Sequence, residues 1–252
     1  MFEFELSVIV PALNEERTIA EVINRLFALP FSTQIIVVND GSTDKTAQIL
    51  ESFGDKIEVI TNEIPSGKGN AIRKALPCIK GLATIIQDAD LEYESSEIPA
   101  LITPIVEGRE KVVFGSRFAN GLPQGMAIPN KIVNVLLALN VRILYGVKLS
   151  DEATCYKALR SDVLQAMELQ CKRFEFCPEV TSKAIRLGCH IAEVPISYTP
   201  RSKNQGKKIR WTDAPEAFLT LFKYRFWKSS RELMDDKVFV QATADNLEIT
   251  PC

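Results

Sequence analysis

Four carboxylates gather in the short stretch QDADLEYE, residues 87–94, directly after the apolar run LATII. Asp88 and Asp90 are two residues apart, so in an extended segment both side chains point to the same face. Two carboxylates at a strand end are a natural site for Mg²⁺ or Mn²⁺, whose other ligands would be waters and substrate phosphate oxygens. The pattern indicates metal-assisted chemistry on a phosphate-bearing substrate, with a solvated acidic loop as the alternative.

Other catalytic motifs are missing from the sequence. The stretch PSGKGNA, 65–71, is not a P-loop, because Asn62 and Gly69 stand where that loop needs a Gly and a Ser or Thr. No G-x-G-x-x-G follows a predicted strand, no G-x-S-x-G occurs, and the single histidine, His190, lies in a strand pattern and is interpreted as structural. The six cysteines form no C-x-x-C pair, which predicts free thiols in a reducing compartment and no zinc site.

Composition restricts the class of protein further. The 252 residues are 46% hydrophobic, enough for one large core, and 30 Lys and Arg against 32 Asp and Glu argue against a nucleic-acid binder. The N-terminus has no basic region typical of a signal peptide. The longest apolar segment, 132–147, is interrupted by Asn140 and Arg142, and it is shorter than the roughly 20 residues that a membrane-spanning helix needs. We therefore expect a cytoplasmic protein.

The first half of the chain alternates short apolar runs with helical patterns. The predicted strands are 6–11, 34–40, 56–61, 82–88 and 111–117, and the predicted helices are 15–29, 42–53, 67–76 and 97–108. Strand–helix–strand repeats with continuous apolar strands predict an α/β fold with a mostly parallel central sheet flanked by helices.

The second half is less regular. It predicts helices at 129–146, 161–167 and 177–188, strands at 154–160 and 190–198, a basic loop at 199–211 and an amphipathic, aromatic-rich segment at 212–228. We expect one domain over residues 1–228, with two halves of about 1–117 and about 118–228, and a weakly structured polar tail at 229–252.

Ligands of open parallel sheets bind beyond the carboxyl ends of the strands. The unusual polar residues of this chain fall at those places, in the stretches 11–15, 40–44, 62–68, 88–92 and 115–117. This position makes a functional role for Asp88 and Asp90 as well supported as that of a solvated loop.

Five motifs occur in order: SVIVPALNEERTI, VVNDGSTDKT, GKGNAIRKAL, QDADLEY and VFGSR. Together they resemble the family 2 glycosyltransferases of the GT-A fold, and more closely the branch with dolichyl-phosphate mannosyltransferase and polyprenyl-phosphate glucosyltransferases. The later stretches DEATCYK, FEFCPEVTSKAIRLG, EVPISYTPRSKNQGKKIRWTD and LFKYRF also resemble that branch. The resemblance covers residues 5 to 227.

The resemblance implies that residues of about 1–117 form a donor half, with a site for a sugar nucleotide, and that residues of about 118–228 form an acceptor half. It places Pro11, Ala12, Asn14, Glu15 and Asp40 around the base and ribose, and Lys68 near the nucleotide. Asp88 and Asp90 match the D-x-D motif that holds the metal on the donor diphosphate, with the small Ala89 between them and Glu92 as a further metal ligand. Asp44 is either part of this site or a helix-capping acid, and Glu94 is assigned to solvent.

The acceptor half needs cations for an acceptor phosphate. The resemblance assigns this role to Arg117 and Lys131, where relatives often have Arg at the second position. Arg201, Lys203, Lys207 and Lys208 are interpreted as a lid over the diphosphate, with a solvated charge run as the alternative. Asp151 is the candidate base if the acceptor is a hydroxyl, with Glu152 as the second choice and a structural role for Asp151 left open.

The expected reaction is an inverting transfer of a hexose to a polyprenyl phosphate. Such an acceptor is already an anion and needs no strong base, which agrees with the missing catalytic histidine. The donor remains open between GDP-mannose, UDP-glucose and UDP-GlcNAc. The alternatives are a family 2 enzyme that glycosylates a soluble or glycan hydroxyl, and a non-catalytic sugar-nucleotide-binding module.

A polyprenyl acceptor would be met at a membrane surface. Segment 212–228 has aromatic and apolar side chains beside Lys223, Arg225 and Lys228, a composition typical of an interfacial helix: Phe218, Leu221, Phe222, Tyr224, Phe226 and Trp227. The alternative is that this segment packs on the core of its own domain. We expect a soluble or peripheral enzyme at the cytoplasmic face.

Overall fold

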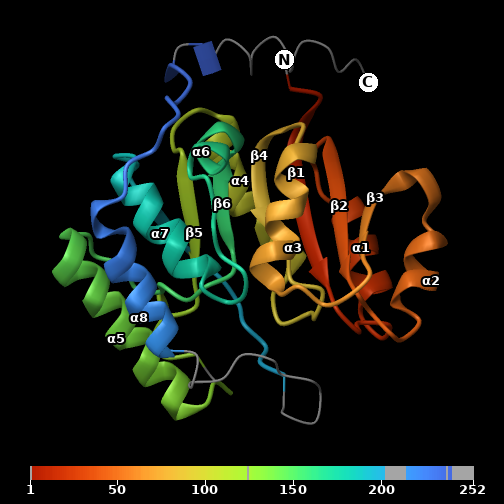
Figure 1. Ribbon diagram of the computed structural model, residues 1–252, viewed down its shortest axis with the longest axis horizontal. Helices are drawn as coiled ribbons and strands as arrows, with labels where there is room; N and C mark the ends of the chain where they lie inside the picture. Colours follow the sequence, from red (N-terminus) through yellow and green to blue (C-terminus); the bar gives the residue numbers. More distant parts are fainter. Residues whose placement is uncertain (1, 124, 202–213, 237, 240–252) are drawn as a thin grey trace.

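The computed structural model describes residues 2–123, 125–201, 214–236 and 238–239. In this part, one seven-stranded sheet has the order β3-β2-β1-β4-β6-β5-β7 (Figure 1). The strands are β1 (Phe4–Ala12), β2 (Thr33–Asp40), β3 (Glu58–Asn62), β4 (Gly81–Ile86), β5 (Val112–Ser116), β6 (Lys157–Arg160) and β7 (Ala192–Pro195). The helices are α1 (Ile19–Phe27), α2 (Thr46–Glu51), α3 (Lys68–Ala75), α4 (Ile98–Val106), α5 (Ile128–Tyr145), α6 (Ser161–Ala166), α7 (Phe176–Arg186) and α8 (Ala214–Lys223).

The central strands are apolar on both sides because helices cover both faces of the sheet. Every residue of β4 and β5 is buried. Helix α3 packs on β1 and β2, while α4 packs on β4, β5 and β6. The predicted helix 15–29 corresponds to α1, which has one buried apolar face made of Ile19, Val22, Ile23 and Leu26. Phe27 is half-exposed beside Phe53. The α/β fold expected from the continuous apolar runs is confirmed.

The sheet is mostly parallel, with one exception. Strand β1 runs parallel to β2 and β4, and β5 runs parallel to β7. Strand β6 lies between β4 and β5 and is antiparallel to both. Because β6 is reversed, the segment just before it, 151–156, lies at the same edge of the sheet as the carboxyl ends of β4 and β5.

Helices α5, α7 and α8 form a group at the β5–β7 side, where α5 and α8 lie side by side (Figure 1). The hydroxyl of Tyr145 in α5 donates to the backbone oxygen of Leu221 in α8 at 2.5 Å. Within the described ranges, no helix is both long enough and apolar enough to cross a bilayer.

The described part of the predicted tail is better ordered than its composition indicated. Phe239 is buried against Phe2, and Arg160 donates to Asp236 at 2.8 Å. The tail residues 237 and 240–252 lie outside the described residues. Asp236 and Phe239 are therefore held by an ion pair and an aromatic contact that the polar composition of the tail did not indicate.

The start of α3 lies directly against the backbone that precedes α7. The amides of Gly69 and Asn70 donate to the carbonyl oxygens of Arg173 at 3.0 Å and Lys172 at 3.1 Å. A Cβ atom on Gly69 would lie 2.8 Å from the carbonyl carbon of Cys171, so only glycine fits this contact. The glycines of the GKG motif thus allow two distant segments to meet.

The substitution Gly69→Ala tests this contact, because helix propensity and the close contact predict opposite changes in stability. Helix propensity alone predicts that Ala stabilises a helix by about 0.5–1 kcal/mol over Gly. The clash with a backbone that cannot rotate away predicts instead a loss of about 1–3 kcal/mol. We expect thermal unfolding of Gly69→Ala at a lower Tm than the wild type, and an increased Tm would contradict the contact.

Candidate active site

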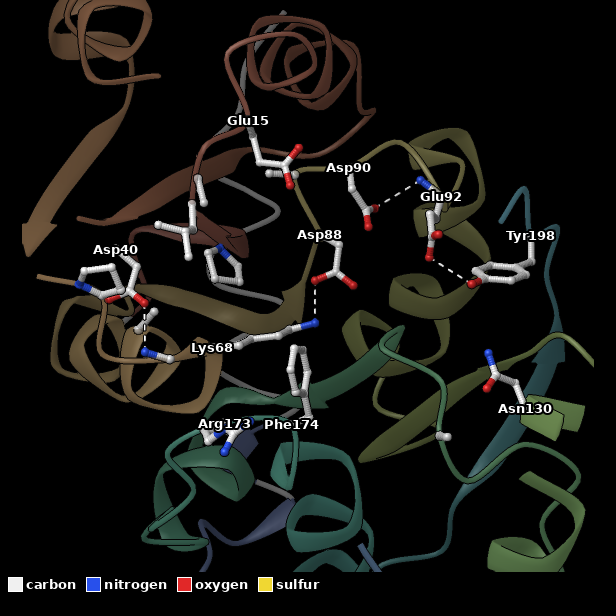
Figure 2. Close-up of a pocket in the computed structure, with 18 of the residues that line it drawn as sticks. Glu15, Asp40, Lys68, Asp88, Asp90, Glu92, Asn130, Arg173, Phe174 and Tyr198 are labelled. Atoms are coloured by element: carbon white, nitrogen blue, oxygen red, sulfur yellow. Dashed lines mark hydrogen bonds and ion pairs between the residues drawn. The ribbon is translucent and has the colours of Figure 1, made fainter. Parts of the chain in front are cut away.

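A cavity of about 410 Å³ opens at the carboxyl ends of the central strands (Figure 2). The ends of β1, β2, β4 and β5 contribute predicted site residues to its lining: Pro11, Ala12, Glu15, Asp40, Asp88, Ala89, Asp90, Glu92 and Arg117. Lys68, at the start of α3, also lines it. The cavity therefore collects most of the residues that sequence reasoning singled out, although they span more than a hundred positions.

Asp40 holds the loop between β3 and α3. Its carboxylate accepts hydrogen bonds from Asn62 Nδ2 at 2.6 Å, from the backbone amide and hydroxyl of Ser66, and from the amide of Gly67 at 2.8 Å. Burial would raise the pKa of Asp40, but these donors together lower it. Asp40 is thus a fixed anion that shapes the loop carrying Lys68.

Lys68 and Asp88 form a partly buried ion pair in the cavity (Figure 2). The Lys68 ammonium also lies 2.8 Å from Cys155 Sγ. Burial would lower the pKa of Lys68, but the negative charge of Asp88 raises it well above its ordinary value. Lys68 is therefore a permanent cation at the first aspartate of the D-x-D pair.

Asp90 carries the least compensated negative charge of the cluster. Burial, and then the charges of Asp88 and Glu92, raise the pKa of Asp90 to about 7. Its carboxylate accepts a hydrogen bond from the amide of Glu92 at 3.1 Å. Because crowded carboxylates repel one another, a cation at this place would relieve the repulsion. The hard oxygen ligands of Asp88 and Asp90 fit Mg²⁺ or Mn²⁺, which use few carboxylates together with substrate phosphates.

The carboxylate of Glu92, which the resemblance implies as a further metal ligand, is hydrogen-bonded to other groups in this structure, so that role stays a prediction. This carboxylate accepts from the hydroxyl of Tyr198 at 2.8 Å and from the amide of Arg201 at 2.6 Å. Among the residues that the structure describes, no three Asp, Glu, His or Cys side chains are grouped so that they could hold a metal ion. In this arrangement Glu92 anchors the chain around Tyr198 and Arg201, because those donors satisfy its oxygens.

Arg201 links two walls of the site from outside the cavity lining. Its guanidinium donates to Glu15 at 3.0 Å, to the backbone oxygen of Asp90 at 2.7 Å and to Thr18 at 3.2 Å. Asn14 does not line the cavity either, because it is exposed and its Oδ1 accepts from the amide of Thr43 at 2.8 Å. Lys203, Lys207 and Lys208 lie outside the described residues, so the predicted lid stays a prediction.

Arg117 and Asp151 form a buried bidentate pair. Arg117 donates from Nε at 2.7 Å, from Nη2 at 2.8 Å and from its amide at 2.9 Å. Asn134 in α5 donates to the same carboxylate at 2.9 Å. Burial would raise the pKa of Asp151, but the charge and hydrogen bonds of Arg117 lower it. Asp151 is fully buried and is not part of the cavity lining, so this geometry does not favour its predicted role as a base.

Helix α5 reaches the cavity through residues that no motif indicated. Asn130, Val133 and Asn134 line it, whereas the predicted Lys131 does not. Tyr198, Arg173 and Phe174 also line the cavity, and Figure 2 shows Arg173 and Phe174 beside Lys68. Asn130 and Asn134 are one helical turn apart, and this polar spacing in a predicted helix was the signal that could have found them.

Removal of the Asp151 charge tests the buried pair. Asp151→Asn leaves Arg117 buried without a counter-charge, so we expect a loss of about 3–5 kcal/mol in denaturant unfolding. The exposed pair of Arg25 with Glu21 is the control, because Glu21→Gln at 55% side-chain exposure should change stability by less than about 1 kcal/mol. Equally small losses of stability in Asp151→Asn and Glu21→Gln would contradict the buried ion pair of Arg117 and Asp151.

The same variant has a defined pH dependence. The pKa of Asp151 is lowered on folding from an ordinary value of 3.8. The contribution of ionised Asp151 to the free energy of unfolding is therefore fully present above pH 3.8, and it is lost as the pH falls through the pKa of the folded state. We expect the stability difference between wild type and Asp151→Asn to stay constant near neutral pH and to narrow only in strong acid.

Comparison with known proteins agrees with this architecture. The model of glycosyl transferase family 2 matches residues 7–167. The chain is 30% identical over 201 residues to the low-salt glycan biosynthesis hexosyltransferase Agl6 of Haloferax volcanii, covering 78% of this chain and 48% of that protein. It is 29% identical over 226 residues to the UDP-N-acetylglucosamine–dolichyl-phosphate N-acetylglucosaminyltransferase of Methanococcus voltae, covering 80% and 89%.

A third relative is the polyprenol monophosphomannose synthase of Mycolicibacterium smegmatis, 28% identical over 222 residues, with 81% and 82% of the two chains covered. Four of the curated relatives that the chain matches are much longer, and the chain spans between 48% and 63% of their length.

Solved structures support the expected GT-A fold. Glucosyl-3-phosphoglycerate synthase from Mycobacterium tuberculosis in complex with UDP aligns with a TM-score of 0.67 at 22% identity, covering 90% of this chain and 82% of that chain. Because the matched family model spans well over half of the 252 residues, the chain belongs to glycosyl transferase family 2.

Proposed function

We propose that this protein transfers a hexose from a sugar nucleoside diphosphate to a polyprenyl phosphate, with inversion and with Mg²⁺ or Mn²⁺. The observation that carries the proposal is the cavity itself, which has Asp88 and Asp90 on one wall and Arg117 on another. The names of the Methanococcus voltae and Mycolicibacterium smegmatis relatives, a dolichyl-phosphate transferase and a polyprenol monophosphomannose synthase, support the class of acceptor.

The donor would lie along the wall made by β1, β2 and β4. The loop fixed by Asp40, together with Pro11, Ala12 and Glu15, would receive the nucleoside, and Asp88 and Asp90 would face the diphosphate. Glucosyl-3-phosphoglycerate synthase has been solved with UDP and Mn²⁺ and with UDP and Mg²⁺, which supports a divalent cation in this fold. When bound, such a cation supplies Lewis-acid stabilisation of the leaving diphosphate.

The protein's own residues have two tasks in the reaction, to stabilise the leaving group and to position the acceptor. A phosphate oxygen of the acceptor attacks C1 of the hexose, the bond from C1 to the diphosphate oxygen breaks, and the nucleoside diphosphate leaves. Lys68 stays charged beside Asp88 and stabilises the negative charge that develops on the leaving group. Arg117 faces the cavity while Asp151 fixes its orientation, so it can position an acceptor phosphate.

The geometry favours a phosphate acceptor over a hydroxyl acceptor. A hydroxyl needs a base that can reach its proton. Asp151 is buried behind Arg117 with both oxygens occupied by donors, and its pKa is lowered by that pairing. A phosphate acceptor is already ionised, so it requires positioning and no proton removal.

The exposed side of α5 and α8 supports contact with a membrane. One stripe of α5, the end of α8 and the turn that follows it, Tyr224–Phe226, expose nine apolar side chains that are between 47% and 77% accessible: Ile128, Ile132, Val135, Leu136, Leu139, Ile143, Leu219, Phe222 and Phe226. Helix α5 has Lys131 and Arg142 and no acidic residue. Apolar surface flanked by cations is typical of elements that bind anionic bilayers.

The predicted interfacial segment, 212–228, contains side chains that pack on the core of the domain and side chains that are exposed. Leu221 and Tyr224 are buried in the packing of α8 on its neighbours, whereas Phe222 and Phe226 are exposed. The opposite side of α5 lines the cavity through Asn130 and Asn134. A lipid-linked acceptor held at this surface would therefore have its phosphate close to the cavity.

Transfer of label from sugar nucleotides into lipid tests the proposed reaction. GDP-mannose, UDP-glucose and UDP-GlcNAc are each incubated with a polyprenyl phosphate and Mn²⁺, and mild-acid-labile lipid product is counted. We expect product from one donor and a loss of at least 100-fold in Asp90→Asn. The control is Glu94→Gln, which removes the carboxylate that pairs with Arg25 at the surface and should leave turnover unchanged. Absence of lipid product with every donor would refute the acceptor class.

Binding to vesicles that contain phosphatidylglycerol tests the membrane surface. The double substitution Leu139→Ser and Ile143→Ser removes two exposed apolar anchors, each worth up to about 1.5–3 kcal/mol when fully buried. We expect at least a tenfold loss of vesicle-bound protein in flotation. Ile64→Ser is the matched control, because Ile64 is 75% exposed on the loop between β3 and α3. An equal loss in the control, or no loss in the double variant, would contradict this surface.

A further inference from the structure

Three cations line the cavity: Lys68, Arg117 and Arg173. Lys68 is paired with Asp88, and Arg117 is paired with Asp151. In the ranges that the structure covers, the guanidinium of Arg173 donates to no side chain or carbonyl, and only its backbone atoms are engaged. Arg173 therefore brings a cation to the cavity wall that no carboxylate of the described chain neutralises.

The backbone that presents Arg173 is held on both sides. Glu175 accepts from the amides of Lys172 at 2.6 Å and Arg173 at 2.9 Å. Glu179 accepts from the amides of Gln170 at 2.8 Å and Cys171 at 2.6 Å. Four consecutive amides are thus held by two carboxylates of one chain segment, which defines the path of the loop.

The same loop is fixed to the donor wall. The carbonyl oxygens of Lys172 and Arg173 accept from the first amides of α3, and the glycines at 67 and 69 leave no room for a Cβ against this backbone. Lys68 lies between those two glycines. The position of Arg173 is therefore tied to that of Lys68, so both cations keep their places relative to Asp88.

We infer that Arg173 binds a phosphate group of a substrate in the cavity, as a second cation beside Lys68. This inference rests on the proposed function, which brings two phosphate-bearing substrates to this cavity. A guanidinium offers a planar pair of donors that matches phosphate oxygens, and it stays charged at every working pH. The phosphate belongs either to the donor diphosphate or to the acceptor, and the two sources are separable by experiment.

Calorimetric titration in the presence of Mn²⁺ distinguishes a donor diphosphate from an acceptor phosphate as the group that Arg173 binds. UDP and GDP probe the diphosphate, and farnesyl phosphate probes the acceptor phosphate. Arg173→Gln removes the charge, and Arg173→Lys keeps it without the planar donors. Lys172→Gln is the matched control, because Lys172 is a neighbouring exposed cation of the same loop that does not line the cavity. The Arg173 side chain holds no other part of the described protein, so each variant should keep the wild-type Tm.

We expect Arg173→Gln to weaken one of the two ligand types by about tenfold or more, since a hydrogen bond to a charged group is lost. Weaker nucleotide binding assigns Arg173 to the donor, and weaker farnesyl phosphate binding assigns it to the acceptor. Arg173→Lys should recover part of the loss, and Lys172→Gln should bind like the wild type.

The inference is overturned if Arg173→Gln binds every probe within twofold of the wild type, or if Lys172→Gln loses as much. In that case the proposed function stands. A wild-type protein that binds neither nucleotide nor farnesyl phosphate refutes the proposed function together with this inference.

Discussion

The concentration of negative charge at the end of β4 is the constraint on which the site depends. Asp88, Asp90 and Glu92 follow one buried strand within five residues, and burial makes their repulsion stronger than it would be in water. The fold compensates part of it with Lys68 on Asp88, and with Tyr198 and the Arg201 amide on Glu92. Asp90 is left as the group whose charge a bound cation would balance.

Compensation of this charge also joins the halves of the protein. Lys68 comes from α3, whose first turn is bonded to the loop before α7, while Arg201 binds Glu15 after β1. On the acceptor side, Asp151 and Asn134 hold Arg117 at the end of β5. The ion pairs of Lys68, Arg117 and Arg201 thus connect different segments of the chain around the cavity.

Much of the donor wall could be predicted from the sequence, because continuous apolar runs mark the parallel strands and the polar residues after them must meet at one edge. The acceptor wall could not be predicted in the same way. A short strand pattern such as 154–160 does not encode the direction of the strand, so the antiparallel β6 could not be predicted. The pairing of Arg117 with Asp151 is a long-range result of packing, and so is the position of Arg173, whose guanidinium is paired with no carboxylate of the described residues. Neither leaves a periodic signal in the sequence.

The central claim is that Asp88 and Asp90 hold a divalent cation that carries a sugar nucleotide. A thermal-shift panel of GDP-mannose, UDP-glucose and UDP-GlcNAc, each with and without Mn²⁺, tests it most directly. Ligands that bind only the folded state raise the Tm. We predict that one sugar nucleotide raises the Tm of the wild type only when Mn²⁺ is present. The claim would be contradicted if no sugar nucleotide shifted the Tm with Mn²⁺, or if the same shift appeared without the metal.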